Sequence, residues 1–150
     1  LGHATQMQLY NMTEQLAYVY NALTSMHTNA NELKENTAIK KKKVVEQIAS
    51  FAVNTQKLKE SLVSLEGDFY VDESSSLRED ISTLALGVSG YPGKPTNGQL
   101  EKMTELQERL DQVLKQFDAF KTELETINEY LQKKELNAIQ LKTFEEFKAG

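Results

Sequence analysis

The chain contains no cysteine, two prolines, seven glycines and two histidines among its 150 residues. Without cysteine there is no disulfide framework and no thiolate chemistry, although this absence does not fix the redox compartment. The scarcity of proline and glycine leaves long stretches without helix breakers, which favours helix. No apolar run approaches the roughly 18 residues needed to cross a bilayer, so we expect no membrane span.

Basic residues are outnumbered by acidic ones, 17 against 22, which gives a net charge of −5. This balance gives no support for nucleic-acid binding, which usually needs a basic patch or stripe. Apolar residues make up 39% of the chain, and this low content suits elongated helices with wide hydrated faces. No signal peptide is visible and the first residue is Leu1. We therefore interpret residues 1–150 as a single domain excised from a longer protein.

Two apolar seams with helical spacing occupy the first half of the chain. The first consists of Leu9, Met12, Leu16, Val19, Leu23, Met26, Ala30 and Leu33. The second consists of Val44, Ile48, Phe51, Thr55, Leu58, Leu62 and Leu65. The two seams are out of phase, which predicts a turn around residues 35–40, with one continuous helix as the alternative.

Two further seams follow a predicted loop over residues 66–76. The third, short seam consists of Leu77, Ile81, Leu84 and Val88, after candidate N-caps at Ser74 to Ser76. The fourth consists of Met103, Leu106, Leu110, Val113, Phe117, Phe120, Leu124, Ile127 and Leu131. Residues 87–98 hold both prolines and read as the main loop, and Thr96 with Gln99 forms a capping-box pattern.

These seams predict an all-α fold: an antiparallel bundle of three long helices and one short helix. Short connections imply that neighbouring helices run antiparallel. The remaining apolar residues of the tail, from Leu136 to Phe147, fit a short C-terminal return segment laid over the end of the bundle. One chain can bury all its seams, so we expect a monomer when the domain is isolated.

No catalytic, cofactor or metal site is expected. His27 lacks the Glu-x-x-His pattern of a di-metal bundle and reads as a residue at the seam boundary. Gly93-Lys94 lacks the remaining residues of a phosphate-binding loop. Asp68, Asp72 and Glu73 do not have EF-hand spacing. Without a convergent polar cluster, the sequence favours a protein that is not an enzyme.

Two surface features have more than one interpretation. The run Lys40 to Lys43 is compatible with an anionic surface, although such short runs are more often solvated. The outward face of the first helix carries Tyr10, Glu14, Ala17 and Tyr18. Tyrosine is enriched at interfaces, so this face is a candidate docking surface. The alternative is contact with the short third helix or with the tail.

The segment Gly90-Tyr91-Pro92-Gly93-Lys94-Pro95-Thr96-Asn97-Gly98-Gln99-Leu100 resembles a loop in one known family. That family is the C-terminal helical domain of bacterial sortilin-like, BNR-repeat β-propeller proteins, often labelled glycosyl hydrolases. Leu110-Asp111 and Ile127-Asn128-Glu129-Tyr130-Leu131 also match. The resemblance implies an origin at the C-terminal end of an exported, periplasmic or extracellular protein, with an upstream β-propeller as partner and no catalytic residue here.

Three functions remain open from the sequence. The first is a non-enzymatic accessory bundle that packs against or links a β-propeller protein. The second is a bundle that senses a ligand or signal, which needs a polar pocket, whereas Thr55 is the only clear polar residue within the seams. The third is a self-associating coiled coil, which the mass in solution distinguishes from the other two.

Overall fold

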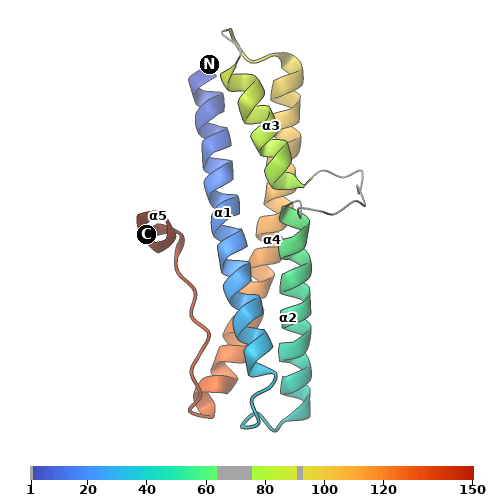
Figure 1. The fold of residues 1–150 in the computed structure, drawn as a ribbon, viewed down its shortest axis with the longest axis vertical. Coiled ribbons are helices and arrows are strands. Elements are labelled where there is room, and N and C mark those ends of the chain that lie inside the picture. The colour runs from blue at the N-terminus through green and yellow to red at the C-terminus, as the bar shows by residue number, and fades with distance from the viewer. Residues whose placement is uncertain (1, 64–75, 91–92) are drawn as a thin grey trace.

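The computed structural model describes residues 2–63, 76–90 and 93–150. Five helices make up this described part, in which no strand occurs: α1 Gly2–Leu33, α2 Lys42–Leu62, α3 Leu77–Ser89, α4 Asn97–Lys133 and α5 Phe144–Ala149. The chain is therefore an all-α bundle, as predicted (Figure 1). The predicted seam residue Leu65, the candidate caps Ser74 and Ser75 and most of the predicted loop over 66–76 lie outside the described residues.

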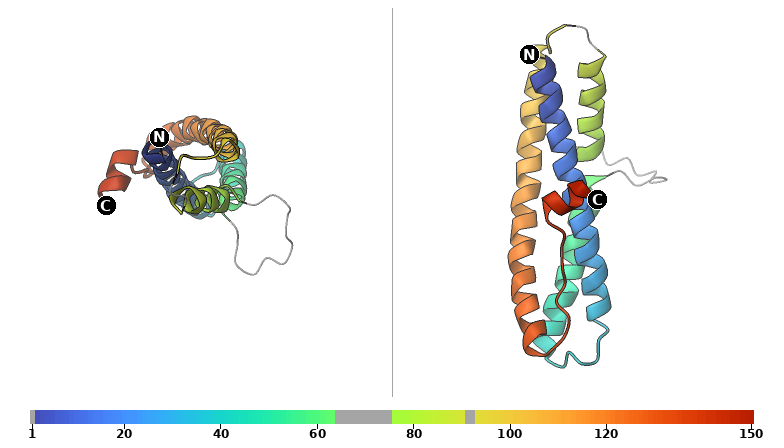
Figure 2. Two further views of the ribbon diagram at one scale, coloured as in Figure 1. Left: turned by 90° about the horizontal axis from the view of Figure 1, so that it is seen from above. Right: turned by 90° about the vertical axis from the view of Figure 1, so that its left-hand side faces the viewer.

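The two longest helices, α1 and α4, run in the same direction along the whole bundle, and α2 and α3 share the third position and run the opposite way (Figures 1 and 2). α2 occupies the lower half and α3 the upper half, and both run in the same direction. Because α2 has 21 residues and α3 has 13, each spans only part of the length of α1, which has 32. The expectation that neighbouring helices are antiparallel is therefore wrong for two pairs: α2 and α3, which follow one another, and α1 and α4, which lie side by side in the same direction.

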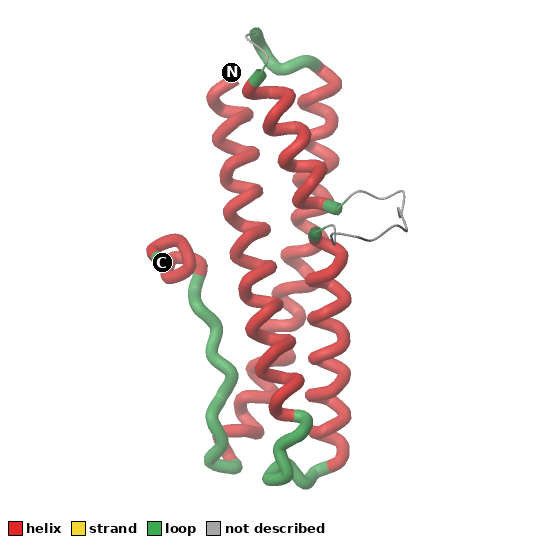
Figure 3. Tube along the Cα trace, viewed as in Figure 1, coloured by secondary structure: helices red, strands yellow, loops and turns green. Residues whose placement is uncertain are grey.

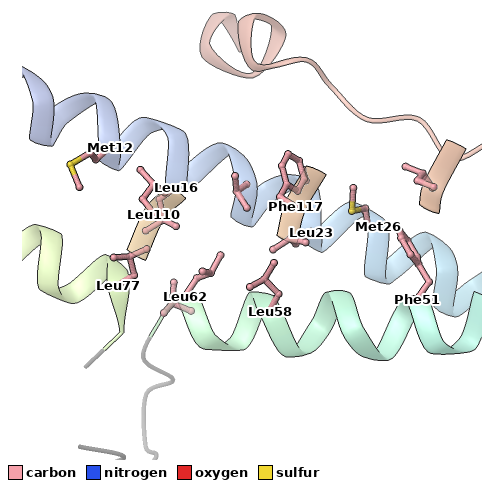
Figure 4. Packing of buried hydrophobic residues seen from close by; sticks show 14 of the residues in the cluster. Met12, Leu16, Leu23, Met26, Phe51, Leu58, Leu62, Leu77, Leu110 and Phe117 are labelled. Atoms are coloured by element: carbon pink, nitrogen blue, oxygen red, sulfur yellow. The ribbon is translucent and has the colours of Figure 1, made fainter. Parts of the chain in front are cut away.

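The predicted seams form one hydrophobic core. Every residue of the first seam is buried except Leu33, which is half-buried. Figure 4 shows residues of α1 facing Leu58 and Leu62 of α2 and Leu77 of α3, with Leu110 and Phe117 coming from α4. Phe117 is buried as expected, whereas Phe120 is only partly buried, at the edge of the seam. Its ring packs edge-on against Phe51, with 5.9 Å between the ring centroids.

The turn between α1 and α2 confirms the phase change seen in the sequence. The Oδ1 atom of Asn36 accepts a hydrogen bond from the backbone N–H of Ala38 at 2.9 Å. The backbone carbonyl of Asn36 accepts another from Ile39 at 3.1 Å. Ile39 is buried at 5% exposure, so the turn contributes an apolar side chain to the lower end of the core.

The start of α4 is fixed by the predicted capping box. The backbone N–H of Gln99 donates to Oγ1 of Thr96, and the backbone N–H of Thr96 donates to Oε1 of Gln99, both at 3.0 Å. The connection before it is shorter than the predicted loop over 87–98, because α3 continues to Ser89 and α4 begins at Asn97. Arg109 of α4 then binds Asp80 of α3, with 2.6 Å between Nη1 and Oδ2, which joins the two helices.

The capping box gives a matched pair of variants. Thr96→Ala should lower the free energy of unfolding by about 1 kcal/mol, because an amide of the first helical turn loses its acceptor. Lys94→Ala, at an exposed residue two positions earlier, should change it little. Denaturant unfolding measures both variants, and equal effects would contradict the role of Thr96 as cap.

The C-terminal segment does not lie over the end of the bundle as expected. Leu136 donates its N–H to the carbonyl of Leu131 at 2.8 Å, and Glu135 donates to Gln132 at 3.0 Å, which closes α4 in a Schellman motif. Glu135 has a φ of 59°, a left-handed conformation usually adopted by glycine. The chain then reverses and runs back along the bundle beside α1 and α4, ending in α5 (Figures 2 and 3).

Candidate docking surface

The outward face of α1 carries Met7, Tyr10, Glu14 and Ala17. The α1 seam faces the core, and these residues lie on the opposite side of the helix because of its 3.6-residue period. Met7 is 44% exposed and Tyr10 is 57% exposed, while Ala17 is also exposed. The structure therefore leaves three of the four predicted docking residues, Tyr10, Glu14 and Ala17, on one accessible or partly accessible face.

The Tyr10 side chain is held on this face by Glu14, one turn later. The Tyr10 hydroxyl donates a hydrogen bond of 2.6 Å to Oε1 of Glu14. This hydrogen bond, followed by the negative charge of the same carboxylate, raises the pKa of the Tyr10 phenol above its usual value. Tyr10 thus presents an exposed aromatic ring to solvent while its hydroxyl is bound to Glu14.

Tyr18, the fourth predicted docking residue, contacts the tail instead. Its hydroxyl donates a hydrogen bond of 2.6 Å to the carbonyl of Lys142. Its ring lies 5.5 Å from that of Phe144 and 5.7 Å from that of Phe147, centroid to centroid, and 5.9 Å from that of Phe117 on α4. The alternative interpretation, contact with the tail, therefore holds for Tyr18, and the available face of α1 is centred on Tyr10.

The tail is also held at a second point, which the sequence analysis missed. The side-chain amide of Asn128 on α4 donates to the carbonyl of Ile139 at 2.9 Å and accepts from its N–H at 2.8 Å. One amide side chain thus satisfies both backbone groups of a buried residue. Asn128 carries no periodic signal in the sequence, because it lies just beside the seam and its partner is backbone.

Two open clefts border the tail. The first, of about 360 Å³, lies between the end of α1 and the start of the tail and is lined by Asn29, Glu32, Leu33, Asn36, Asn137, Ala138, Ile139 and Gln140. The second, of about 290 Å³, lies between α1 and α4 and is lined by Gln15, Tyr18, Val19, Leu114, Phe117, Asp118, Lys121 and Phe144. Thr55 lines neither cleft, because it is completely buried. Its hydroxyl donates to the carbonyl of Phe51 within its own helix at 2.8 Å.

The other residues weighed from the sequence lie apart from one another. His27 donates from Nδ1 to the carbonyl of Ala52 on α2 at 2.8 Å, so its ring joins α1 to α2 at the edge of the core. Lys94 is exposed before the start of α4. The acids Asp68, Asp72 and Glu73 lie outside the described residues. Within the described ranges, no three His, Cys, Asp or Glu side chains form a group suited to a metal ion.

The lysine run lies at the lower end of the bundle. Lys40 to Lys43 are exposed and lead into α2. Lys133, at the C-terminal end of α4, lies at the same end of the molecule (Figure 1). The lysines are therefore far from Tyr10, which lies in the N-terminal part of α1 at the upper end of the bundle.

Glu123 is a partly buried carboxylate on α4. Partial burial on α4 raises the pKa of the Glu123 carboxyl. The folded state therefore holds the proton more tightly than the unfolded chain, and the free energy of unfolding falls as the pH rises from the unfolded pKa through the folded one.

Glu123→Gln should thus raise the denaturant midpoint modestly at pH 7. The difference should vanish below about pH 4, where the glutamate is protonated in both states. Glu125→Gln, at an exposed neighbour, is the control and should shift the midpoint less. A gain that is the same at pH 3 and pH 7 would contradict this origin.

Comparisons with known proteins give no relative from which a role can be transferred. No helix in the described ranges combines the length and apolarity that crossing a membrane requires. No family model matches the chain, and neither the curated proteins nor the solved structures include a match.

Proposed function

We propose that this chain is a non-enzymatic accessory bundle that acts by protein–protein contact, and that the outward face of α1 packs against a β-propeller of the same polypeptide. The observation that carries the proposal is the exposed aromatic ring of Tyr10, which the bundle itself does not need. The resemblance of residues 90–100 to the family with upstream propellers supports the choice of partner. The same resemblance supports a periplasmic or extracellular location for the parent protein.

The apolar content of this face is concentrated enough to support docking. Met7 and Tyr10 are three residues apart, so they lie on the same side of α1. The other exposed large apolar side chains in the described part of the chain are Val53 on α2, Leu86 on α3 and Leu100 on α4. A tyrosine suits an interface, because its apolar ring can be buried against a partner while its hydroxyl keeps a hydrogen bond. Interfaces between domains of one chain are modest and fairly polar, which matches this face.

The test uses the longer polypeptide that carries this chain. Met7→Ala with Tyr10→Ala should loosen the contact, so that a protease cleaves several-fold faster between the propeller and the bundle. Val53→Ala with Leu86→Ala is the matched control, because it removes a similar exposed apolar area from other helices. All four changes lie at exposed positions, so the isolated bundle should melt like the wild type in both cases.

Two outcomes would contradict the proposal. The first is an unchanged rate of cleavage in the Met7/Tyr10 variant, and the second is a parent polypeptide without a propeller. Faster cleavage in the Val53/Leu86 control as well would show that the effect comes from general loosening and not from the face on α1.

A further inference from the structure

The groove between α1 and α4 holds the C-terminal segment, residues 136–147, as a protein holds a bound peptide. This segment is extended from residue 136 to residue 143 and helical only in α5 (Figure 3). Its hydrogen bonds are made with Tyr18 of α1 and Asn128 of α4, and its backbone runs beside these two helices (Figure 2). The covalent connection of the segment to the bundle is the turn that follows α4.

Two side chains of the groove recognise the backbone of this segment. Asn128 pairs with both the N–H and the carbonyl of Ile139, at 2.8 and 2.9 Å. Three residues further along, the Tyr18 hydroxyl binds the carbonyl of Lys142 at 2.6 Å. These bonds depend on an extended backbone in the groove and not on the covalent connection to α4. Main-chain hydrogen bonds of this kind give affinity when an extended peptide binds in trans.

Apolar side chains of the segment supply the selectivity. Ile139 is buried at 7% exposure, and the rings of Phe144 and Phe147 both pack against the Tyr18 ring. No residue of α5 is fully buried, and an open cleft of about 290 Å³ remains beside Phe144. Ile139 thus belongs to the hydrophobic core, whereas α5 lies on its outer side.

The connection between α4 and the tail is a tight turn whose left-handed residue is not a glycine. Residues 99–149 have neither glycine nor proline, yet the chain turns back at Glu135 with a φ of 59°. A side chain at this conformation brings Cβ too close to the backbone. The hydrogen bonds of Glu135 and Leu136 to the last turn of α4 hold this conformation, so the turn belongs to α4 and not to the tail.

From this geometry we propose that the groove between α1 and α4 binds the C-terminal segment of a second copy of this chain, in exchange for its own. The occupant is a second copy, because the groove already fits residues 136–147 of this sequence, and another copy carries the same residues. In a reciprocal pair each copy supplies Phe144 and Phe147 to the Tyr18 of the other. Such an exchange of identical elements is a common route to dimers.

The tether decides which form predominates. A tail joined by a short linker faces its own groove at an effective concentration of roughly millimolar, so the intact chain remains a monomer at micromolar concentration. A substitution that weakens the contact between a tail and the groove of its own chain removes this effective concentration. Binding of that tail to the groove of another copy then becomes measurable.

Two full-length variants separate the groove from the tail. The groove variant, Tyr18→Phe with Asn128→Ala, loses the three hydrogen bonds to the segment but keeps the tail. The tail variant, Phe144→Ser with Phe147→Ser, keeps the groove but loses both rings, which are only half-buried. Each variant alone should sediment at the chain mass of 17.0 kDa. An equimolar mixture, at a total concentration on the order of 1 mM, should shift toward twice this mass.

The control is a chain that carries all four changes, mixed with the tail variant. It has no competent tail to donate, so its mixture should remain at 17.0 kDa. Association in this control, or a first mixture that stays at the monomer mass, would overturn the proposal. If circular dichroism shows that the groove variant is unfolded, Asn128→Ala alone replaces it, with the same two outcomes. No propeller is present in this experiment, so its result is independent of the proposed function.

Discussion

Phe51→Ala should lower the free energy of unfolding by about 3–5 kcal/mol, as truncations of a large buried aromatic residue do. The side chain of Phe51 is completely buried on α2, and Phe120 of α4 packs edge-on against its ring at 5.9 Å. The change removes apolar area from the core and leaves a cavity where α2 meets α1 and α4. Denaturant unfolding followed by circular dichroism measures the loss.

The control for this variant is Val53→Ala, two residues away on the same helix. Val53 is 51% exposed, so its truncation should cost less than about 0.5 kcal/mol. A loss below about 1 kcal/mol for Phe51→Ala would mean that the packing of α2 in the lower half of the bundle is wrong.

Asn128→Ala should lower the free energy of unfolding by about 2 kcal/mol, because it leaves the N–H and the carbonyl of Ile139 without their partner. The cost is below that of two fully buried orphan groups, since water can reach the adjacent cleft lined by Ile139. Glu129→Ala is the control, because it changes the exposed neighbour of Asn128. Equal melting of the two variants would show that the Asn128 amide does not hold the tail.

The sequence predicted the helices and the core because both depend on local periodicity. Apolar residues at steps of three and four identify a buried face whatever the partner helix is. The capping residues Thr96 and Gln99 identified the start of α4 for the same reason, since the interaction spans only three residues. The phase change between the first two seams likewise located the turn around Asn36.

The sequence did not predict features that depend on contacts between distant segments. The sequence shows the length of the third seam. It does not show that α3 lies beyond the end of α2, because this depends on how the two helices pack beside α1. The path of the tail depends on Asn128 and Tyr18, whose partners are backbone groups that no residue pattern reveals. The docking face was therefore predicted with Tyr18 included, whereas the structure leaves Tyr10 as its centre.

The division of the third position between α2 and α3 has a consequence for the order in which the protein opens. Amide hydrogens of α3 can exchange with solvent after α3 alone detaches, while α1, α2 and α4 remain packed. α3 has 13 residues, so it lies at the limit of helix stability in water once it is detached. Its amides are therefore exposed to exchange in the detached form. α1 packs most extensively on α2, and amides in that pair should exchange only through larger openings. The division between α2 and α3 thus separates one continuous core into two parts. The lower part sets the global stability, and the upper part has its own, smaller free energy of opening.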